Sequence, residues 1–551
     1  MDPIPADLVF LGGQVLTLDG GRRAQAVAVV DGRIAALGTT NEVGAWIGPG
    51  TEVVQLHGRA LLPGFVDPHT HFGMTTFEPV AVDCRIPPLR DKHAVIDAIA
   101  AAASAAPVGQ WILGLGYSSR NGRTPMELLR EDLDVAAPEN PVCVVDLSVH
   151  CSYANSAAMR LARLTKETPD PDGGHYVRDA HGEAAGTLWE RAMDTIYGMS
   201  LTGLTEAYGE DAVAELVRQN SQRHLALGIT SVADAAVTPE AARVYRMADQ
   251  RGKLPMTLHE MRAGPGFFAE PDPIAQHEFL QSSPPTTRLL GGTMKMFMDP
   301  VFPRNAGYQV HPDGTKERLG RPYYQPERAG ALAAEASSRG LQVAIHCLGT
   351  WAIDLAMDAI GEAIRESESA DQRHRLEHFT TPTYEQIHRA AGMELTVVTQ
   401  PSFFYQGGEK SAERLAESGI DAPPAPLRRM IDEGLSVALS SDFPCGPLAP
   451  LAGISSLVSR QTRGSLEPVA AEEAISAAEA VELYTIAGAR SMHRETEVGS
   501  IEVGKRADVI VLTHDPTAVD PTMLREISVE QTYVDGLRVF DLYGRTAAAS
   551  G

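Results

Sequence analysis

Short apolar runs alternate with alanine-rich stretches between residues 61 and 494, and this alternation constrains the fold more than any other feature of the chain. Apolar runs separated by helical stretches are typical of parallel strands joined by crossover helices. The helical stretches include Pro326–Arg339, Trp351–Glu366 and Ala471–Ser491. The candidate strands are the run that ends at His69 and then Trp111–Gly114, Val142–Ser148, Ile229–Asp234, Met256–Glu260, Thr293–Met298, Leu341–His346, Arg375–His378, Glu394–Thr399 and Leu435–Ser440. A (β/α)8 barrel needs eight strands, so we predict an α/β protein with a TIM-like barrel over residues 61–494 and an insertion around residues 115–225 that holds the surplus strands.

Two β-rich segments flank this region. Residues 1–60 contain short apolar runs broken by turns, and the pair Asp31-Gly32 between two of these runs is a strong hairpin signal. Similar runs return over residues 495–545. We therefore predict one small β-sandwich domain that is built from both ends of the chain.

The charge and the cysteines of the chain restrict its partners and its compartment. The formal net charge is −24 at pH 7, whereas nucleic acids and anionic membranes select basic surfaces, so neither is expected as a partner. No apolar run reaches membrane-spanning length, and the N-terminus lacks the basic start of a secretory signal. The five cysteines are odd in number and lack CxxC spacing, which favours a reducing compartment. We expect a cytoplasmic homodimer that acts on a small molecule.

Several candidate strands end on residues that can bind a metal ion. His69 and His71 lie two residues apart, and residues at this spacing share one face of a strand. Two other runs end at His346 and His378, and a third leads into Asp442. Functional groups of a parallel barrel gather at the carboxyl ends of its strands, and imidazole is the commonest protein metal ligand. The sequence therefore predicts a metal centre at this end, in which His69, His71 and Asp442 bind the more buried ion.

Lys295 lies within the otherwise apolar strand Thr293–Met298. An ammonium group cannot bind a metal ion, but burial lowers the pKa of a lysine toward the free amine. A neutral amine can add carbon dioxide and become N6-carboxylysine, an anion whose two oxygens could bridge two metal ions. The alternative is an unmodified lysine that pairs with Asp299 or contacts the substrate.

Motifs along nearly the whole chain carry a resemblance to a known family. They are LPGFVDPHTH at 62–71, NSAAM at 155–159, GGHYVRD at 173–179, GITSVAD at 228–234, HRLEH at 374–378, SSDFP at 440–444 and GSIEVGKRAD at 499–508. With these motifs the chain resembles the amidohydrolase superfamily, specifically its YtcJ-like branch (amidohydrolase family 3), which includes an N-substituted formamide deformylase. Two loops depart from the family pattern: Asp299-Pro300 stands where Asp-Gly is common, and Gly349-Thr350 stands where Gly-Asp is favoured.

The resemblance implies further roles at the metal centre. It implies that His346 and His378 bind a second, more exposed ion and that Lys295 occupies the position of the bridging carboxylysine. His150 stands where relatives place a polar residue that faces the pocket, so it is predicted to polarise the substrate carbonyl, with a structural histidine as the alternative. The candidate substrate contacts are Arg304, Asp299 and Trp351.

Together these residues predict a metal-dependent hydrolase that cleaves a non-peptide C–N bond, in an amide or an N-formyl amine. One or two divalent ions per chain, with zinc as the expected metal, would supply hydroxide, and Asp442 would act as the proton shuttle. The alternatives are a lactone or carbamate hydrolase or a decarboxylase on the same metal site, and a catalytically inactive scaffold that binds a small ligand.

Overall fold

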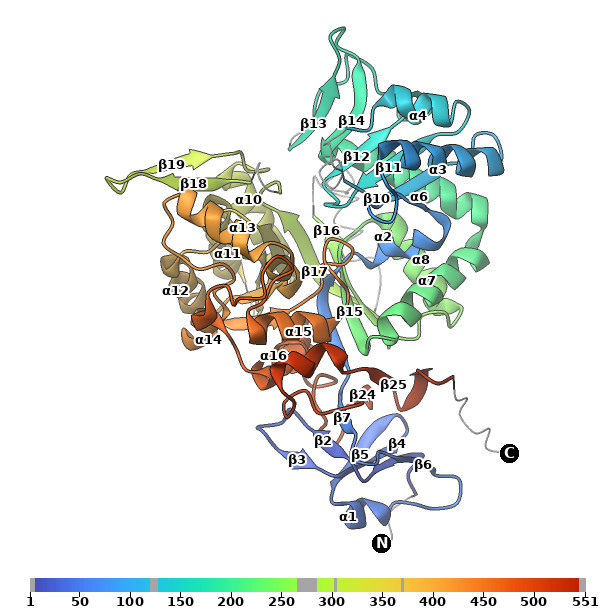
Figure 1. The fold of residues 1–551 in the computed structure, drawn as a ribbon, viewed down its shortest axis with the longest axis vertical. Coiled ribbons are helices and arrows are strands. Elements are labelled where there is room, and N and C mark those ends of the chain that lie inside the picture. The colour runs from blue at the N-terminus through green and yellow to red at the C-terminus, as the bar shows by residue number, and fades with distance from the viewer. Residues whose placement is uncertain are drawn as a thin grey trace.

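Eight parallel strands form the centre of the molecule (Figure 1). The computed structural model describes residues 5–118, 127–171, 173–264, 285–301, 305–367 and 371–544. The eight strands, in the order in which they pair, are β8 (Phe65–Thr70), β15 (Ile229–Val237), β16 (Thr257–Ala263), β17 (Leu289–Phe297), β20 (Gln342–Cys347), β21 (Arg375–His378), β22 (Thr396–Thr399) and β23 (Ser436–Leu439). All neighbours pair in parallel, which confirms the predicted TIM-like barrel.

The first and last strands of the barrel are joined by hydrogen bonds near their carboxyl ends. The backbone N–H of Asp442 donates to the carbonyl oxygen of His69 (2.9 Å). The N–H of His71 donates to the carbonyl oxygen of Phe443 (2.8 Å). These two bonds nearly close the barrel, and they also hold two segments that are far apart in sequence beside each other at its mouth.

Helices follow the barrel strands and cover the outside of the barrel. They are α2 (Phe72–Thr76), α7 (Glu210–Leu225), α8 (Pro239–Gln250), α10 (Pro326–Ser338), α11 (Thr350–Glu366), α12 (Tyr384–Gly392), α13 (Pro401–Glu417), α14 (Leu427–Asp432), α15 (Pro450–Ser459), α16 (Ala477–Leu483) and α17 (Ile486–Ser491). Four of them begin with proline, whose fixed φ and missing N–H suit the first turn of a helix.

One predicted helix is divided in the structure. The stretch 471–491 contains the separate helices α16 and α17 instead of one continuous helix. Ser476 starts α16 because its hydroxyl accepts the N–H of Glu479 (3.2 Å), as helix caps do. Thr485 then leaves the helical region, with φ −129° and ψ −92°, and so separates the two helices. Periodicity did not reveal either boundary.

A second sheet stands beside the mouth of the barrel, at the upper right of Figure 1. It contains β9 (Val82–Asp83), β10 (Ile112–Tyr117), β11 (Val142–Asp146), β12 (Cys151–Ala154), β13 (Gly174–Arg178) and β14 (Ala184–Glu190), in the order β13-β14-β12-β11-β10-β9. Its helices are α3 (Lys92–Ala105), α4 (Arg130–Ala136), α5 (Ser156–Leu161) and α6 (Asp194–Tyr208).

This inserted sheet starts earlier than the predicted insertion at 115–225. It begins at Val82, because the chain leaves the barrel directly after the short helix α2. It also ends earlier than expected, since α7 packs against α8 and β15 of the barrel. The two candidate strands that the barrel does not use, Trp111–Gly114 and Val142–Ser148, correspond to β10 and β11 of this sheet.

Strands from both ends of the chain form two further sheets at the bottom of Figure 1. One holds β1 (Leu8–Leu11), β4 (Ala26–Val30), β5 (Arg33–Gly38) and β6 (Glu52–Gln55), beside the short helix α1 (Thr40–Gly44). The other holds β2 (Gln14–Leu16), β3 (Arg23–Ala24), β7 (Ala60–Pro63), β24 (Val509–Leu512), β25 (Val529–Val534) and β26 (Leu537–Asp541). Their shared core includes an edge-to-face contact between Phe10 and Tyr533, with ring centroids 4.9 Å apart.

The passage from these sheets into the barrel requires a glycine. Gly64 connects β7 to β8, and a Cβ at this position would lie 2.2 Å from the Thr230 hydroxyl oxygen. No side chain fits at that distance, so Gly64 permits the close approach of β8 to β15. The strand that carries His69 is positioned in this way.

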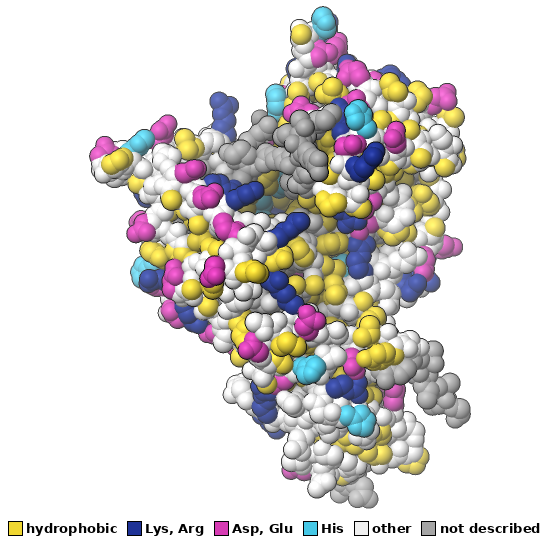
Figure 2. Space-filling view, in the orientation of Figure 1, with side chains coloured by type: hydrophobic (Ala, Val, Ile, Leu, Met, Phe, Trp, Pro, Cys, Tyr) yellow, Lys and Arg dark blue, Asp and Glu magenta, His cyan; other side chains and the backbone are white. Residues whose placement is uncertain are grey.

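The surface is mixed in charge. On the face shown in Figure 2, Lys and Arg side chains are interspersed with Asp and Glu and do not gather into one basic patch. No helix in the described part of the chain combines the length and apolarity needed to cross a membrane. A two-stranded hairpin of β18 (Gly307–Val310) and β19 (Lys316–Leu319) projects from the barrel side of the mouth (Figure 1).

Candidate metal centre

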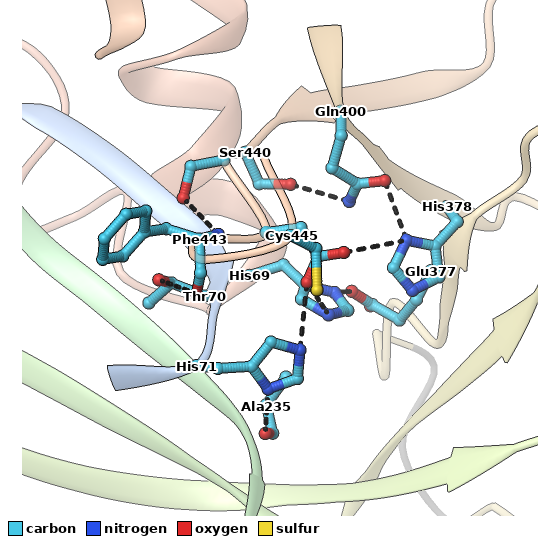
Figure 3. Close-up of polar contacts among 12 residues, drawn as sticks. His69, Thr70, His71, Ala235, Glu377, His378, Gln400, Ser440, Phe443 and Cys445 are labelled. Atoms are coloured by element: carbon cyan, nitrogen blue, oxygen red, sulfur yellow. Dashed lines mark hydrogen bonds and ion pairs between the residues drawn. The ribbon is translucent and has the colours of Figure 1, made fainter. Parts of the chain in front are cut away.

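Three side chains at the mouth of the barrel meet in a group that can hold one metal ion. His69, His71 and Asp442 each offer a ligand atom, and these atoms lie within 4.8 Å of one another. Figure 3 shows the two histidines of this group. Asp442 Oδ1 lies 3.1 Å from His71 Nε2 and 3.5 Å from His69 Nε2. His69 comes from the end of β8, and Asp442 follows β23, so the closure of the barrel creates this group.

The hydrogen bonds around the two histidines define their tautomers. His71 Nδ1 lies 3.2 Å from the carbonyl oxygen of Ala235, and His69 Nδ1 contacts the carboxylate of Glu377 (Figure 3). Both partners only accept hydrogen bonds, so each Nδ1 carries a proton. The Nε2 atoms of both rings face the Asp442 carboxylate, and a cation between them would stabilise this arrangement. The residues present therefore fit a divalent metal ion.

Glu377 belongs to this centre, although the sequence analysis gave it no role. Its carboxylate is fully buried and accepts two hydrogen bonds from Arg375, at 2.6 and 3.0 Å. Burial acts to raise the pKa of Glu377, but Arg375 and His69 outweigh it and hold the pKa well below its usual range. Burial also lowers the pKa of His69 to about 4, which favours the neutral ring. An anionic partner that orients a ligand histidine is typical of metal sites.

His346 and His378 extend the group toward the next strands. Their ring centroids lie 4.5 Å apart, and that of His378 lies 4.7 Å from His69. His378 Nδ1 donates to Gln400 Oε1 (2.8 Å), so its Nε2 is left for another partner. His346 Nε2 is buried without a hydrogen-bond partner among the described residues. The structure thus brings all four predicted histidine ligands together.

Left-handed backbone conformations turn two of these residues into the mouth. Strand alternation alone would place His378 on the face opposite to Glu377. Its φ of +69° departs from the extended conformation at the end of β21. Asp442 has a φ of +52° in the loop that follows β23. Non-glycine residues adopt such angles rarely, and they do so mostly where the surrounding structure imposes them at functional sites.

Lys295 lies beneath the histidines, inside the barrel. Only 1% of the residue is exposed, and its Nζ has no hydrogen-bond partner among the described residues. Burial lowers the pKa of Lys295 to about 8. The Lys295 amine is therefore not hydrogen-bonded to Asp299. The Asp299 oxygens instead accept three backbone N–H groups, from Ala306, Leu348 and Gly349.

A cavity of about 380 Å³ opens above the metal centre. It is lined by barrel residues and by residues of the inserted sheet, such as His150, Trp189 and Glu190. The Phe403 ring stacks on His378 at one side, with centroids 6.0 Å apart. A smaller hollow of about 50 Å³ shares His71, His150 and Phe297 with it. The metal centre therefore lies between a large space and a small one.

The predicted substrate contacts have different positions. His150 faces the centre, with its ring centroid 5.4 Å from that of His346. Asp299 lies below, 3.8 Å from His346 Nε2, where its backbone bonds fix the loop before α11. Trp351 lines a separate hollow beside Arg318, because the first turn of α11 points it away from the cavity. Arg304 lies outside the described residues.

Replacing Glu377 with glutamine is expected to weaken metal binding about 10- to 100-fold, the usual cost of removing the partner of a ligand histidine. Competition with a coloured chelator measures this affinity. Glu260→Gln is the matched control, because Glu260 forms a similar buried pair with Arg262 two residues away (2.7 Å) but lies outside the centre. Equal metal affinity of the two variants would contradict the role of Glu377.

The chain is similar to several known proteins. A model of the amidohydrolase family matches residues 52–540. The N-substituted formamide deformylase of Arthrobacter pascens is 37% identical over 540 residues, which cover 98% of this chain and 99% of that protein. The YtcJ protein of Bacillus subtilis is 29% identical, over 97% of this chain and 99% of its own. A solved structure of an uncharacterized metal-dependent hydrolase from Pyrococcus horikoshii covers 94% of this chain and 99% of its own, with a TM-score of 0.72 and 20% identity. This last likeness shows a shared fold.

Proposed function

The chain belongs to the amidohydrolase family, and from this premise we propose that it hydrolyses N-substituted formamides to formate and an amine. The observation that carries the proposal is the 37% identity to a formamide deformylase over nearly the whole of both chains. A water oxygen bonds to the formyl carbon, the C–N bond breaks, and the nitrogen leaves with a proton.

The two spaces beside the metal centre support this substrate class. The hollow of about 50 Å³ is small enough to restrict the acyl group, whereas the cavity of about 380 Å³ has room for a bulky nitrogen substituent. Apolar side chains such as Trp189, Phe297 and Phe403 line the larger space. Apolar linings with a few polar groups are typical of small-molecule sites.

Asp442 and His150 have different roles in the proposed reaction. A bound divalent ion would lower the pKa of a water molecule and polarise the carbonyl. Asp442, held beside His69 and His71, accepts the proton of the attacking water and passes it to the leaving nitrogen. His150 donates a hydrogen bond to the carbonyl oxygen as negative charge develops there.

The identity and number of the ions are part of the proposal. Imidazole and carboxylate ligands favour zinc, with His69, His71 and Asp442 at one ion and His346 and His378 at another. Lys295 would join the two as N6-carboxylysine. The homodimer and the cytoplasmic location remain predictions from the sequence.

A substrate panel tests the function. The purified protein, loaded with zinc, is assayed with N-benzylformamide, the matching acetamide, a carbamate and a lactone, and formate or amine release is measured. We expect the formamide to be the best substrate and a chelator to abolish turnover. Preference for the lactone or the carbamate would overturn the proposed substrate, and metal-free activity or the absence of any turnover would overturn the hydrolase mechanism.

A further inference from the structure

A carboxylate of the inserted sheet holds His150 at the mouth of the barrel. Glu190 ends β14, and its Oε2 lies 2.6 Å from His150 Nδ1. The backbone N–H of Glu190 also donates to the carbonyl oxygen of His150 (2.8 Å). Both residues are buried, with 5% and 8% of their surfaces exposed. The pair is thus fixed at two points and is shielded from solvent.

The same carboxylate is bonded to the barrel. The Tyr323 hydroxyl donates to Glu190 Oε2. Tyr323 is itself anchored, because its backbone N–H donates to the carbonyl oxygen of Met298 (2.8 Å), just beyond β17. Glu190 therefore links the inserted sheet to the barrel strand that carries Lys295.

Two glycines of the GGHYVRD motif make room for this link. A Cβ on Gly173 would lie 2.7 Å from the Tyr323 ring, and the φ of Gly173 is +74°. A Cβ on Gly174 would lie 2.4 Å from the backbone nitrogen of Ala192, and Gly174 pairs directly with Glu190 across β13 and β14. A larger residue at Gly173 would push the sheet away from Tyr323, and one at Gly174 would displace the segment that follows Glu190. The motif thus has a structural reason to contain this pair of glycines.

The backbone of Glu190 is strained. Its φ is +55° and its ψ is −130°, outside the regions that non-glycine residues commonly adopt. Such conformations persist where the surroundings impose them, often at functional sites. In addition, Glu190 Oε1 is buried without a hydrogen-bond partner among the described residues. The strained backbone and the unbonded oxygen both destabilise the folded protein. A glutamate with a purely structural role would require neither.

We propose that Glu190 is a positioning residue that fixes His150 with Nε2 toward the substrate, so that the inserted sheet supplies part of the catalytic apparatus. The inference deepens the proposed function and rests on it. With Nδ1 bonded to Glu190, only Nε2 of His150 is left for the cavity, which His150 lines together with the metal ligands.

A double-mutant cycle tests the coupling. Glu190→Ala is expected to lower kcat about 10- to 100-fold, the range for removing a group that orients a histidine, while KM and metal content stay unchanged. In the His150→Ala background the same replacement should change kcat less than about twofold, because coupled residues are not additive. Glu190→Gln, which keeps an acceptor for the histidine, should recover part of the loss. Asp170→Ala removes an exposed partner of His175 (2.9 Å) in the same sheet and is the matched control.

Each outcome decides the inference. Equal losses from Glu190→Ala in both backgrounds, or wild-type kcat in Glu190→Ala, would overturn it. A wild-type enzyme without turnover on the panel would refute the proposed function instead.

The hydrogen bond between His150 and Glu190 is observed directly in the low-field proton spectrum of the zinc-loaded protein. The Nδ1–H signal that is lost in His150→Ala should also be lost in Glu190→Ala and retained in Asp170→Ala, and its persistence in Glu190→Ala would refute the pairing.

Discussion

Replacing Asp442 with asparagine is expected to lower kcat at least about 100-fold, the scale of general acid–base catalysis alone. The amide cannot accept the proton of the attacking water, and it offers no negative charge to a cation between His69 and His71. Burial acts to raise the pKa of Asp442, but the neighbouring His71 and His69 outweigh it and hold the pKa well below its usual range. The carboxylate is therefore available as a base at neutral pH.

The measurement combines kcat on N-benzylformamide with metal content and thermal unfolding. Asp508→Asn is the matched control, because Asp508 is also a buried aspartate but lies near the terminal sheets, where it accepts the N–H of Asp535 (2.7 Å). The control should keep full activity. A folded Asp442→Asn protein with near-normal kcat would remove Asp442 from the mechanism, and one that keeps its metal but loses turnover would separate proton transfer from metal binding.

The barrel and the convergence of its histidines could be predicted from the sequence, because both depend on local patterns. Buried parallel strands appear as apolar runs, and residues at their carboxyl ends must meet once the barrel forms. His69 and His346 illustrate this rule, since each lies at the end of such a run and the two reach the same cavity. The eight strands of the barrel all came from runs visible in the sequence.

The partners of these histidines could not be predicted in the same way. Glu377 contacts His69 across 308 residues, a distance that no local pattern reports. One signal was present: Arg375 and Glu377 are two charged residues two positions apart in a buried strand, and charges there are costly unless they are paired. The orientation of His378 was also hidden, because it depends on a positive φ and not on strand alternation.

The role of the inserted sheet could be seen only in three dimensions. Its start at Val82 follows from where the chain leaves the barrel, which composition does not reveal. Glu190 and Tyr323 are 133 residues apart, and Tyr323 lies in the loop before α10, so their contact depends on how the insertion packs on the barrel. Trp351 is a different case: it was predicted as a substrate contact, but in the structure it lines a separate hollow beside Arg318.

Replacing Lys295 with alanine is expected to remove at least one metal ion per chain and to lower kcat/KM about 100-fold or more. Removing one group that stabilises the charge of the transition state has an effect of this size. The buried Nζ lacks a partner among the described residues and lies 4.8 Å from the centroid of the Phe297 ring. Burial lowers its pKa to about 8, so the free amine that reacts with carbon dioxide is accessible near neutral pH. A carbamate would supply the anionic oxygens that an ammonium group cannot.

Chemical rescue distinguishes the bridge from a merely structural lysine. Acetate or propionate should partly restore metal content and turnover in Lys295→Ala, because a short carboxylate can occupy the space of the missing carbamate. Lys92→Ala is the control, since Lys92 is buried in the insertion, where its Nζ donates to the Glu127 carbonyl oxygen (3.0 Å). Neither acid should change the metal content or the turnover of Lys92→Ala. An unmodified amine beside one fully occupied metal ion in a crystal of the active protein would refute the bridge. Chemistry at His69, His71 and Asp442 with a single ion would remain consistent with that result, whereas a two-metal mechanism would not.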